Sequence, residues 1–274
     1  MILQPITIIE LAALGLTGGF LAGLLGVGGG MVLVPFMVWI LGQYNVTGEL
    51  AIKMAIATSM ATIVFTSISS VRAHHKRGAV RYDIVRGIAP GILVGAIIAS
   101  LGVFALVKGA WLSWSFGIVV WFAAIQMFLD RKPKPTRNMP GPAGQLAAGG
   151  FIGFLSGLVG AGGGFMSVPF MAWCNVAIHN AVATSAALGF PIAFFNSIGY
   201  IISGWSVVDR PAYSLGYIWL PALFVIVCCS VLTAPLGAKA AHSLPVKTLK
   251  RIFSLVLMAL ATSMLYKGWQ LVTN

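Results

Sequence analysis

The chain has 274 residues, of which 59% are hydrophobic and 8% are charged, and its mean hydropathy is +0.96. A soluble domain carries about 25% charged residues because water must wet its surface, so this composition excludes a soluble fold and indicates a membrane protein. The formal net charge is +12, from 17 Lys and Arg against 5 Asp and Glu.

Ten apolar segments follow one another along the chain, five on each side of a basic stretch at residues 130–142. The first segment can cross about 30 Å of hydrocarbon at ~1.5 Å per residue, and it lacks the basic start and cleavage site of a signal peptide. We expect an all-α polytopic membrane protein with membrane repeats at 1–129 and 143–274. Helices are expected near 6–25, 31–41, 50–71, 82–107, 111–129, 144–159, 165–176, 178–202, 215–238 and 251–269.

The second half of the chain repeats the first. LLGVGGGMVLVPFMVW ends at Trp39 and LVGAGGGFMSVPFMAW ends at Trp173, and Gly19–Trp39 matches Gly153–Trp173 at 14 of 21 positions. A second pair of blocks, AIKMAIATS and AIHNAVATS, ends at Ser59 and Ser185. This self-similarity indicates a duplication.

Each glycine-rich motif separates a long apolar segment from one that is too short to span a membrane comfortably. Either each half crosses five times, or its first two segments form a re-entrant hairpin and three helices span. We favour the hairpin, because non-helical backbone survives at membrane depth only when it is buried in protein or lines a cavity.

The charges predict which loops face the cytoplasm. Residues 72–86, 130–142 and 239–251 hold 13 of the 17 Lys and Arg, and such loops stay inside during insertion. Residues 203–214, with one Arg and one Asp, suit the outside. Matching loops of the two halves then lie on opposite sides, which predicts inverted-topology repeats with both termini outside. The cations serve topology, and no nucleic-acid partner is expected.

Broken helices in two inverted halves are the best sequence pointer to a transporter's substrate site. At such a break the backbone approaches a ligand closely, and the next helix offers N–H groups that suit an anion. Close helix packing is the alternative, which we favour for the earlier glycines of each motif. The predicted anion-binding glycines are Gly28, Gly29, Gly30, Gly162, Gly163 and Gly164.

Side chains near the breaks extend this candidate site. Hydroxyls that repeat in both halves could donate to oxyanion oxygens, or could bond to carbonyls of their own helices. Asn196 could line the pathway or join two helices. The predicted substrate-binding side chains are those of Thr58, Ser59, Thr184, Ser185 and Asn196.

Four further residues are candidates for charge attraction or gating. Lys53 and His179 occupy matching positions, and the alternatives are interfacial snorkelling or, for Lys53, an ion pair with Glu49 four residues earlier. Trp39 and Trp173 could wall the site or mark the membrane interface. With no metal-ligand pattern and no catalytic set, we expect no metal, no cofactor and no enzyme.

The doubled GxxGxGGG…VPF block, the ATS helices and the ending GAKAAHSLPVKTLKRIFSLVLMAL resemble the TauE/SafE sulfite-exporter family over essentially the whole chain. The resemblance implies a multi-pass inner-membrane permease for small sulfur oxyanions or organosulfonates, without an ATP-hydrolysing domain. The first half lacks the GAKAAH sequence, which argues against a symmetric role for Lys239 and His242.

We therefore expect a secondary transporter that moves a small anion, sulfite or an organosulfonate, out of the cytoplasm by alternating access. The alternatives are an uptake permease and a passive anion channel of the same fold. The expected partners are the anionic substrate and the lipid bilayer, and the sequence leaves a homo-oligomer open.

Overall fold

A computed structural model describes residues 4–26, 29–129, 137–243 and 247–273. Proline and glycine set the ends of its first helix in each half. α1 (Pro5–Leu25) and α7 (Pro142–Val159) begin at a proline, whose fixed φ suits the first helical position. They end at Gly26 and Gly160, whose φ angles of 68° and 71° are left-handed. Glycine adopts this conformation without steric cost, so the helices stop there.

The remaining elements alternate long helices with two short ones, as the apolar segments predict. The first half continues with α2 (Gly30–Gln43), α3 (Gly48–His75), α4 (Tyr82–Ile97), a π-helical stretch η1 (Ile98–Val103), α5 (Phe104–Leu106) and α6 (Gly109–Leu129). The second half continues with α8 (Gly164–Trp173), α9 (Ile178–Ser203), the strands β1 (Ser214–Leu215) and β2 (Ile218–Trp219), α10 (Leu220–Ser243) and α11 (Lys247–Thr273).

The structure confirms an all-α polytopic membrane protein. Among the described residues, eight helices are long and apolar enough to cross a membrane. Large apolar side chains cover the outside, including Ile118 at 63% exposure, Phe224 at 71% and Leu232 at 72%. An exposed apolar surface of this extent is stable only against lipid.

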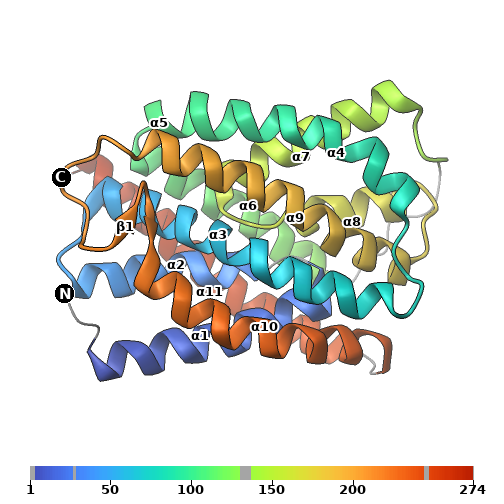
Figure 1. Ribbon diagram of the computed structural model, residues 1–274, viewed down its shortest axis with the longest axis horizontal. Helices are drawn as coiled ribbons and strands as arrows, with labels where there is room; N and C mark the ends of the chain where they lie inside the picture. Colours follow the sequence, from blue (N-terminus) through green and yellow to red (C-terminus); the bar gives the residue numbers. More distant parts are fainter. Residues whose placement is uncertain (1–3, 27–28, 130–136, 244–246, 274) are drawn as a thin grey trace.

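Each half packs its helices against helices of the other half, and equivalent helices of the two halves make equivalent pairs. α1 lies along α10, and α7, which leads into the second glycine motif as α1 leads into the first, lies along α4. α3 lies beside α9 and α6 beside α11 (Figure 1). Close approach depends on glycine: a Cβ on Gly23 would overlap the Ala234 carbonyl, and one on Gly153 would lie 2.6 Å from the Ile92 oxygen. The earlier glycines of each motif therefore serve packing, as expected.

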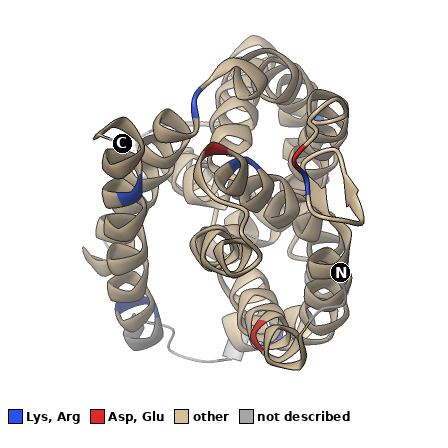
Figure 2. Cartoon of the chain, turned by 90° about the vertical axis from the view of Figure 1, so that its left-hand side faces the viewer, with Lys and Arg blue, Asp and Glu red and all other residues tan. Residues whose placement is uncertain are grey.

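The ends of the bundle differ in charge. α3, α6 and α10 end, and α4, α7 and α11 begin, on the right of Figure 1, whereas α1 begins and α11 ends on the left. The three basic stretches adjoin the right-hand helix ends, as the predicted topology requires. Figure 2 looks onto the opposite end, where Lys, Arg, Asp and Glu colour only a few places on the ribbon. Which end faces the cytoplasm stays a prediction.

Several segment boundaries differ from the sequence expectation, and the two helix starts that move most are those of α10 and α11. α10 begins at Leu220, five residues late, because β1 and β2 form an antiparallel hairpin in which Ser214 faces Trp219. Arg210 fixes this turn by donating to the carbonyls of Val207 at 2.6 Å and Gly216 at 3.2 Å. α11 begins at Lys247, four residues early.

Candidate functional site

Each glycine motif joins two helices into a hairpin. At the open end of the first hairpin, the Tyr44 hydroxyl donates to Thr7 Oγ1 and accepts from the Gln4 N–H, both at 3.1 Å. At the open end of the second, the Arg137 guanidinium lies 4.7 Å from the Trp173 ring centre. α2 has 14 residues and α8 has 10, about 21 and 15 Å of helix, too short to span.

The two glycine breaks meet inside the bundle. A Cβ on Gly30 would overlap the carbonyl oxygen of Gly160, so only glycine permits this approach. Ser59 Oγ on α3 donates to that Gly160 oxygen at 3.2 Å. Ser185 Oγ on α9 donates to the Gly26 oxygen at 2.9 Å. Each serine therefore ties the helix of one half to the break of the other.

The threonines beside these serines also form hydrogen bonds between the two halves. The Trp219 N–H donates to Thr58 Oγ1, and the Arg81 N–H donates to Thr184 Oγ1, both at 3.0 Å. Trp219 and Arg81 directly precede α10 and α4, so each threonine fixes the start of a helix from the other half. Thr58, Ser59, Thr184 and Ser185 are fully buried. Their repetition has a structural role at this junction.

A small cavity of about 10 Å³ lies next to the junction. Three hydroxyl residues of α3 face it: Thr66, Ser67 and Ser70. Thr66 and Ser67 donate to carbonyls of their own helix, at 3.1 and 3.0 Å, whereas Ser70 Oγ has no hydrogen-bond partner in the described part of the chain. The rest of the lining is apolar or small: Ala22, Gly26, Ile63, Gly162, Ala186 and Gly189.

The predicted glycines divide into three groups. Gly29 and Gly163 precede α2 and α8 with φ angles of 72° and 76°, so their conformation favours glycine. Gly30 and Gly164 are the first residues of those helices, whose first N–H groups lack intrahelical acceptors. Gly162 lines the cavity. Gly28 lies outside the described residues.

Asn196 lies away from this cavity. It is fully buried on α9, and its Nδ2 donates to the Ile192 carbonyl at 2.8 Å. Its Oδ1 has no partner among the described residues and lies 2.3 Å from the position that a Cβ on Gly157 would take. Tyr200 donates to the carbonyl of the same Gly157. Asn196 therefore belongs to the contact between α7 and α9.

The four candidates for charge attraction or gating also lie elsewhere. Lys53 Nζ donates to the Ala105 carbonyl at 3.1 Å. No ion pair within 4.0 Å joins it to Glu49 in the described structure, so the alternative of a Lys53–Glu49 ion pair is not found there. His179 is exposed at the start of α9. Trp39 and Trp173 are 55% and 41% exposed and face outward, as interfacial tryptophans do.

The hairpin of β1 and β2 covers Lys53. Its Nζ lies 6.0 Å from the ring centre of Tyr217, between β1 and β2. Burial raises the pKa of the Tyr217 phenol, and the nearby Arg210 charge offsets part of that rise. The phenol thus stays neutral at physiological pH. No group of three or more His, Cys, Asp or Glu that could hold a metal occurs within the described ranges.

Sequence reasoning missed the row of hydroxyls on α3. Ser59, Thr62, Thr66 and Ser70 recur at intervals of three and four residues, and all are buried. This spacing places them on one helix face. The same periodicity test that identifies an apolar face would have found this polar one.

Comparisons with known proteins give one family for this chain and relatives that are all named as membrane transporters. The chain matches the family model described as sulfite exporter TauE/SafE over residues 11–264. It is 38% identical over 253 residues to a Haemophilus influenzae protein named "Probable membrane transporter protein", covering 92% of this chain and 96% of that one. The Bacillus subtilis protein named "Probable membrane transporter protein YunE" is 29% identical, covering 94% of this chain and 97% of that one. A Methanocaldococcus jannaschii protein is 27% identical, covering 97% and 96%. No solved structure gives a significant match.

Proposed function

The chain belongs to the sulfite exporter TauE/SafE family and is a membrane transporter, and on that premise we propose that it exports a small sulfur oxyanion or organosulfonate from the cytoplasm. The transport mechanism we propose is alternating access between two inverted repeats, residues 1–129 and 143–274. The single observation that carries the proposed mechanism is the crossed pair of hydrogen bonds from Ser59 to Gly160 and from Ser185 to Gly26.

The crossed bonds support an inverted duplication because they are equivalent under exchange of the halves. Ser59 and Ser185 end the matching blocks, and Gly160 and Gly26 end the first helices of the two motifs. The helix pairs exchange in the same way, with α1 on α10 and α7 on α4. In Figure 1 the hairpin of α1 and α2 opens towards one end of the bundle and that of α7 and α8 towards the other.

The proposed substrate site is the cavity between the breaks. Its polar lining consists of hydroxyl and backbone groups, with no charged residue. Neutral donors suit a singly charged –SO₃⁻ group that must also be released, because they bind an anion less tightly than a buried Lys or Arg does. A buried cation would also carry a large desolvation cost. Ser70, whose hydroxyl has no acceptor in the described structure, is the first donor we assign.

The cavity must enlarge before the substrate enters. At about 10 Å³ it offers space near the lower limit for one water molecule. Sulfite has four heavy atoms and needs a larger space than one water molecule does. In the proposed cycle this is the closed state, and opening separates α3 and α9 from the facing break on one side at a time.

Export follows from the charge of the substrate. When a monoanion leaves a cell whose interior is negative, its free energy falls by roughly 2.3 kcal/mol per 100 mV of membrane potential. Export therefore needs no coupling ion, whereas concentrative uptake does. The proposed direction rests on this argument and on the family.

Counterflow in proteoliposomes tests the proposal. Purified protein is reconstituted, and entry of labelled sulfite, and separately of labelled sulfoacetate, is measured with and without unlabelled sulfite, sulfoacetate, taurine, thiosulfate or sulfate trapped inside. Saturable entry that trapped substrate accelerates is expected of a carrier. Entry that is linear in concentration and insensitive to trapped substrate would identify a passive channel, and entry no faster than in empty liposomes for every anion would refute the proposed substrate class.

A further inference from the structure

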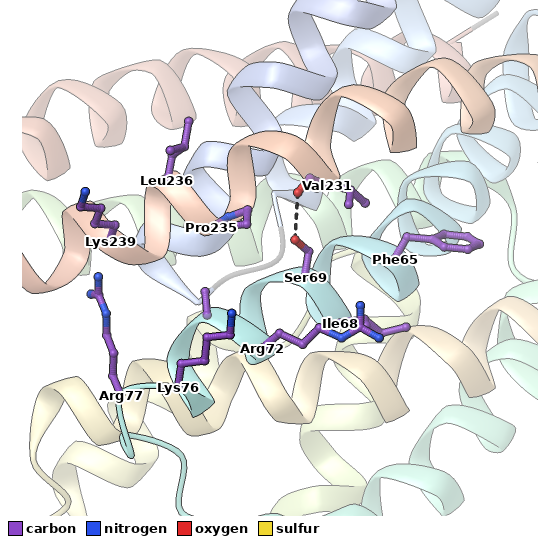
Figure 3. A pocket seen from close by; sticks show the side chains of 11 residues that line it. Phe65, Ile68, Ser69, Arg72, Lys76, Arg77, Val231, Pro235, Leu236 and Lys239 are labelled. Atoms are coloured by element: carbon purple, nitrogen blue, oxygen red, sulfur yellow. Dashed lines mark hydrogen bonds between the residues drawn. The ribbon is translucent and has the colours of Figure 1, made fainter.

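A second concave site lies on the lipid-facing side of the bundle, between α3 and α10. It is a groove of about 600 Å³ at the end of the bundle that carries the basic stretches (Figure 3). Ser69 Oγ donates to the Val231 carbonyl at 2.8 Å and joins the two helices across the groove. Phe65 and Leu236, 45% and 58% exposed, form apolar walls.

The charged lining of this groove is entirely basic. Arg72, Lys76 and Arg77 come from the end of α3 and the turn after it, and Lys239 comes from α10. Figure 3 shows Lys76, Arg77 and Lys239 towards one end of the groove and Phe65 towards the other. The Arg77 guanidinium also donates to the Ala238 carbonyl at 3.2 Å, which holds it beside α10.

This groove is separate from the proposed substrate cavity. Phe65, Ile68, Ser69 and Arg72 line the groove, whereas Thr66, Ser67 and Ser70 line the cavity. Successive residues of a helix differ by about 100°, so the two sets occupy different faces of α3. The groove therefore opens to the bilayer and not to the transport path.

We propose that the groove binds one anionic phospholipid of the adjacent leaflet, with its headgroup phosphate among Lys76, Arg77 and Lys239 and an acyl chain along Phe65 and Leu236. The occupant follows from the combination of cations and lipid-exposed apolar walls. Basic pockets between membrane helices bind anionic headgroups, and apolar walls retain a chain that a soluble anion lacks. The lipid would hold α3 against α10, and hence one half of the protein against the other.

Lipid binding to the purified full-length chain in neutral detergent tests this site. Binding of phosphatidylglycerol and phosphatidylcholine is titrated by native mass spectrometry, and thermal unfolding is followed with each lipid and with inorganic phosphate alone. We expect tighter binding of phosphatidylglycerol than of phosphatidylcholine, with a rise in unfolding temperature that inorganic phosphate does not reproduce.

Two charge-matched double variants locate the effect. Lys76→Gln with Lys239→Gln should weaken phosphatidylglycerol binding about 25-fold, at roughly fivefold per cation. The control, Arg86→Gln with Arg251→Gln, removes two exposed cations elsewhere and should leave binding unchanged. Unfolding in detergent alone verifies that both variants fold. Equal loss in both variants, equal binding of the two lipids, or equal stabilisation by inorganic phosphate would each overturn the proposal.

Discussion

The hydroxyl of Ser185 donates a 2.9 Å hydrogen bond to the carbonyl oxygen of Gly26, across 159 positions of sequence. Ser185 also accepts a 2.8 Å bond from the Ser167 hydroxyl, so a buried chain of donors ends at the first glycine break. Gly26 ends α1 in a left-handed conformation, and its carbonyl has no further helical turn to bond with. Ser185 supplies the donor that this helix end requires.

Removing that donor should destabilise the whole bundle. Ser185→Ala leaves the Gly26 carbonyl and the Ser167 hydroxyl buried without this partner. The expected loss is about 1–3 kcal/mol of unfolding free energy. Thermal unfolding in detergent measures it. Ser263→Ala is the control, because that exposed hydroxyl bonds only to its own helix, at Leu260. Equal stability of both variants would mean that the Ser185 bond contributes nothing at the junction.

Thr58 should protect one specific backbone amide. Its Oγ1 accepts the Trp219 N–H at 3.0 Å, and a Val of the same shape has no acceptor. Thr58→Val should therefore cost about 1–3 kcal/mol and speed hydrogen exchange at the start of α10. Hydrogen–deuterium exchange with peptide resolution checks this. Unchanged exchange around Trp219 would contradict the role given to Thr58.

Cysteine labelling should place the two ends of the bundle on opposite sides of the membrane. The three native cysteines are first replaced by Ala. Val208, which is 90% exposed and lies shortly before the β1–β2 hairpin, is then changed to Cys. Asn138→Cys lies in the described part of the linker, before α7. In intact cells an impermeant maleimide should label position 208 and reach position 138 only after lysis. Labelling of both positions in intact cells would refute the inverted topology.

The helices could be predicted from the sequence because their apolar segments are long and their ends carry Pro or Gly. Pro5 and Gly26 bound α1, and Pro142 and Gly160 bound α7, close to the expected segments. The start of α10 was placed too early because Leu215, Ile218 and Trp219 continue without a charged residue into the helix that follows. Hydropathy does not separate a short hairpin from a helix start; only tertiary contacts do.

The candidate site could be predicted only in part. The glycine breaks were recognised because repetition isolates them from other apolar sequence, and the structure brings Gly30 and Gly160 together. The partners of Ser59 and Ser185 lie 101 and 159 positions away, and periodicity within one segment carries no information on such contacts. Ser70 was overlooked because a single hydroxyl in a membrane helix usually bonds to its own backbone.

Gly29 should be required for folding before it is required for transport. Its φ is 72°, and a Cβ there would lie 2.5 Å from the Gly18 carbonyl oxygen. The left-handed backbone alone costs an L-residue about 1–2 kcal/mol, and the contact adds to this. Gly29→Ala should therefore lower the unfolding temperature. Gly42→Ala, in the helix α2 that Gly29 precedes, is the matched control: its Cβ would have nothing within 4 Å, so it should be neutral or stabilising. Equal unfolding temperatures would show that the break tolerates a side chain.

Gly189 separates folding from transport, and so tests the proposed substrate cavity. It lines the cavity within α9, where a Cβ would lie 3.6 Å from Ser67 Cβ and 3.7 Å from the Gly162 oxygen. These are ordinary van der Waals distances, so Gly189→Ala should fold, with a helix-propensity gain of about 1 kcal/mol.

The added methyl group occupies space that the substrate needs, and sulfite counterflow should fall roughly tenfold or more, since one methylene in a binding pocket has effects of that order. The control is Gly150→Ala in α7, whose Cβ would likewise make an ordinary contact, 3.7 Å from the Gly91 oxygen, away from the cavity. Gel filtration and thermal unfolding verify the fold of both variants, and counterflow in proteoliposomes compares their rates. If Gly189→Ala transports as fast as Gly150→Ala, the substrate does not pass through this cavity.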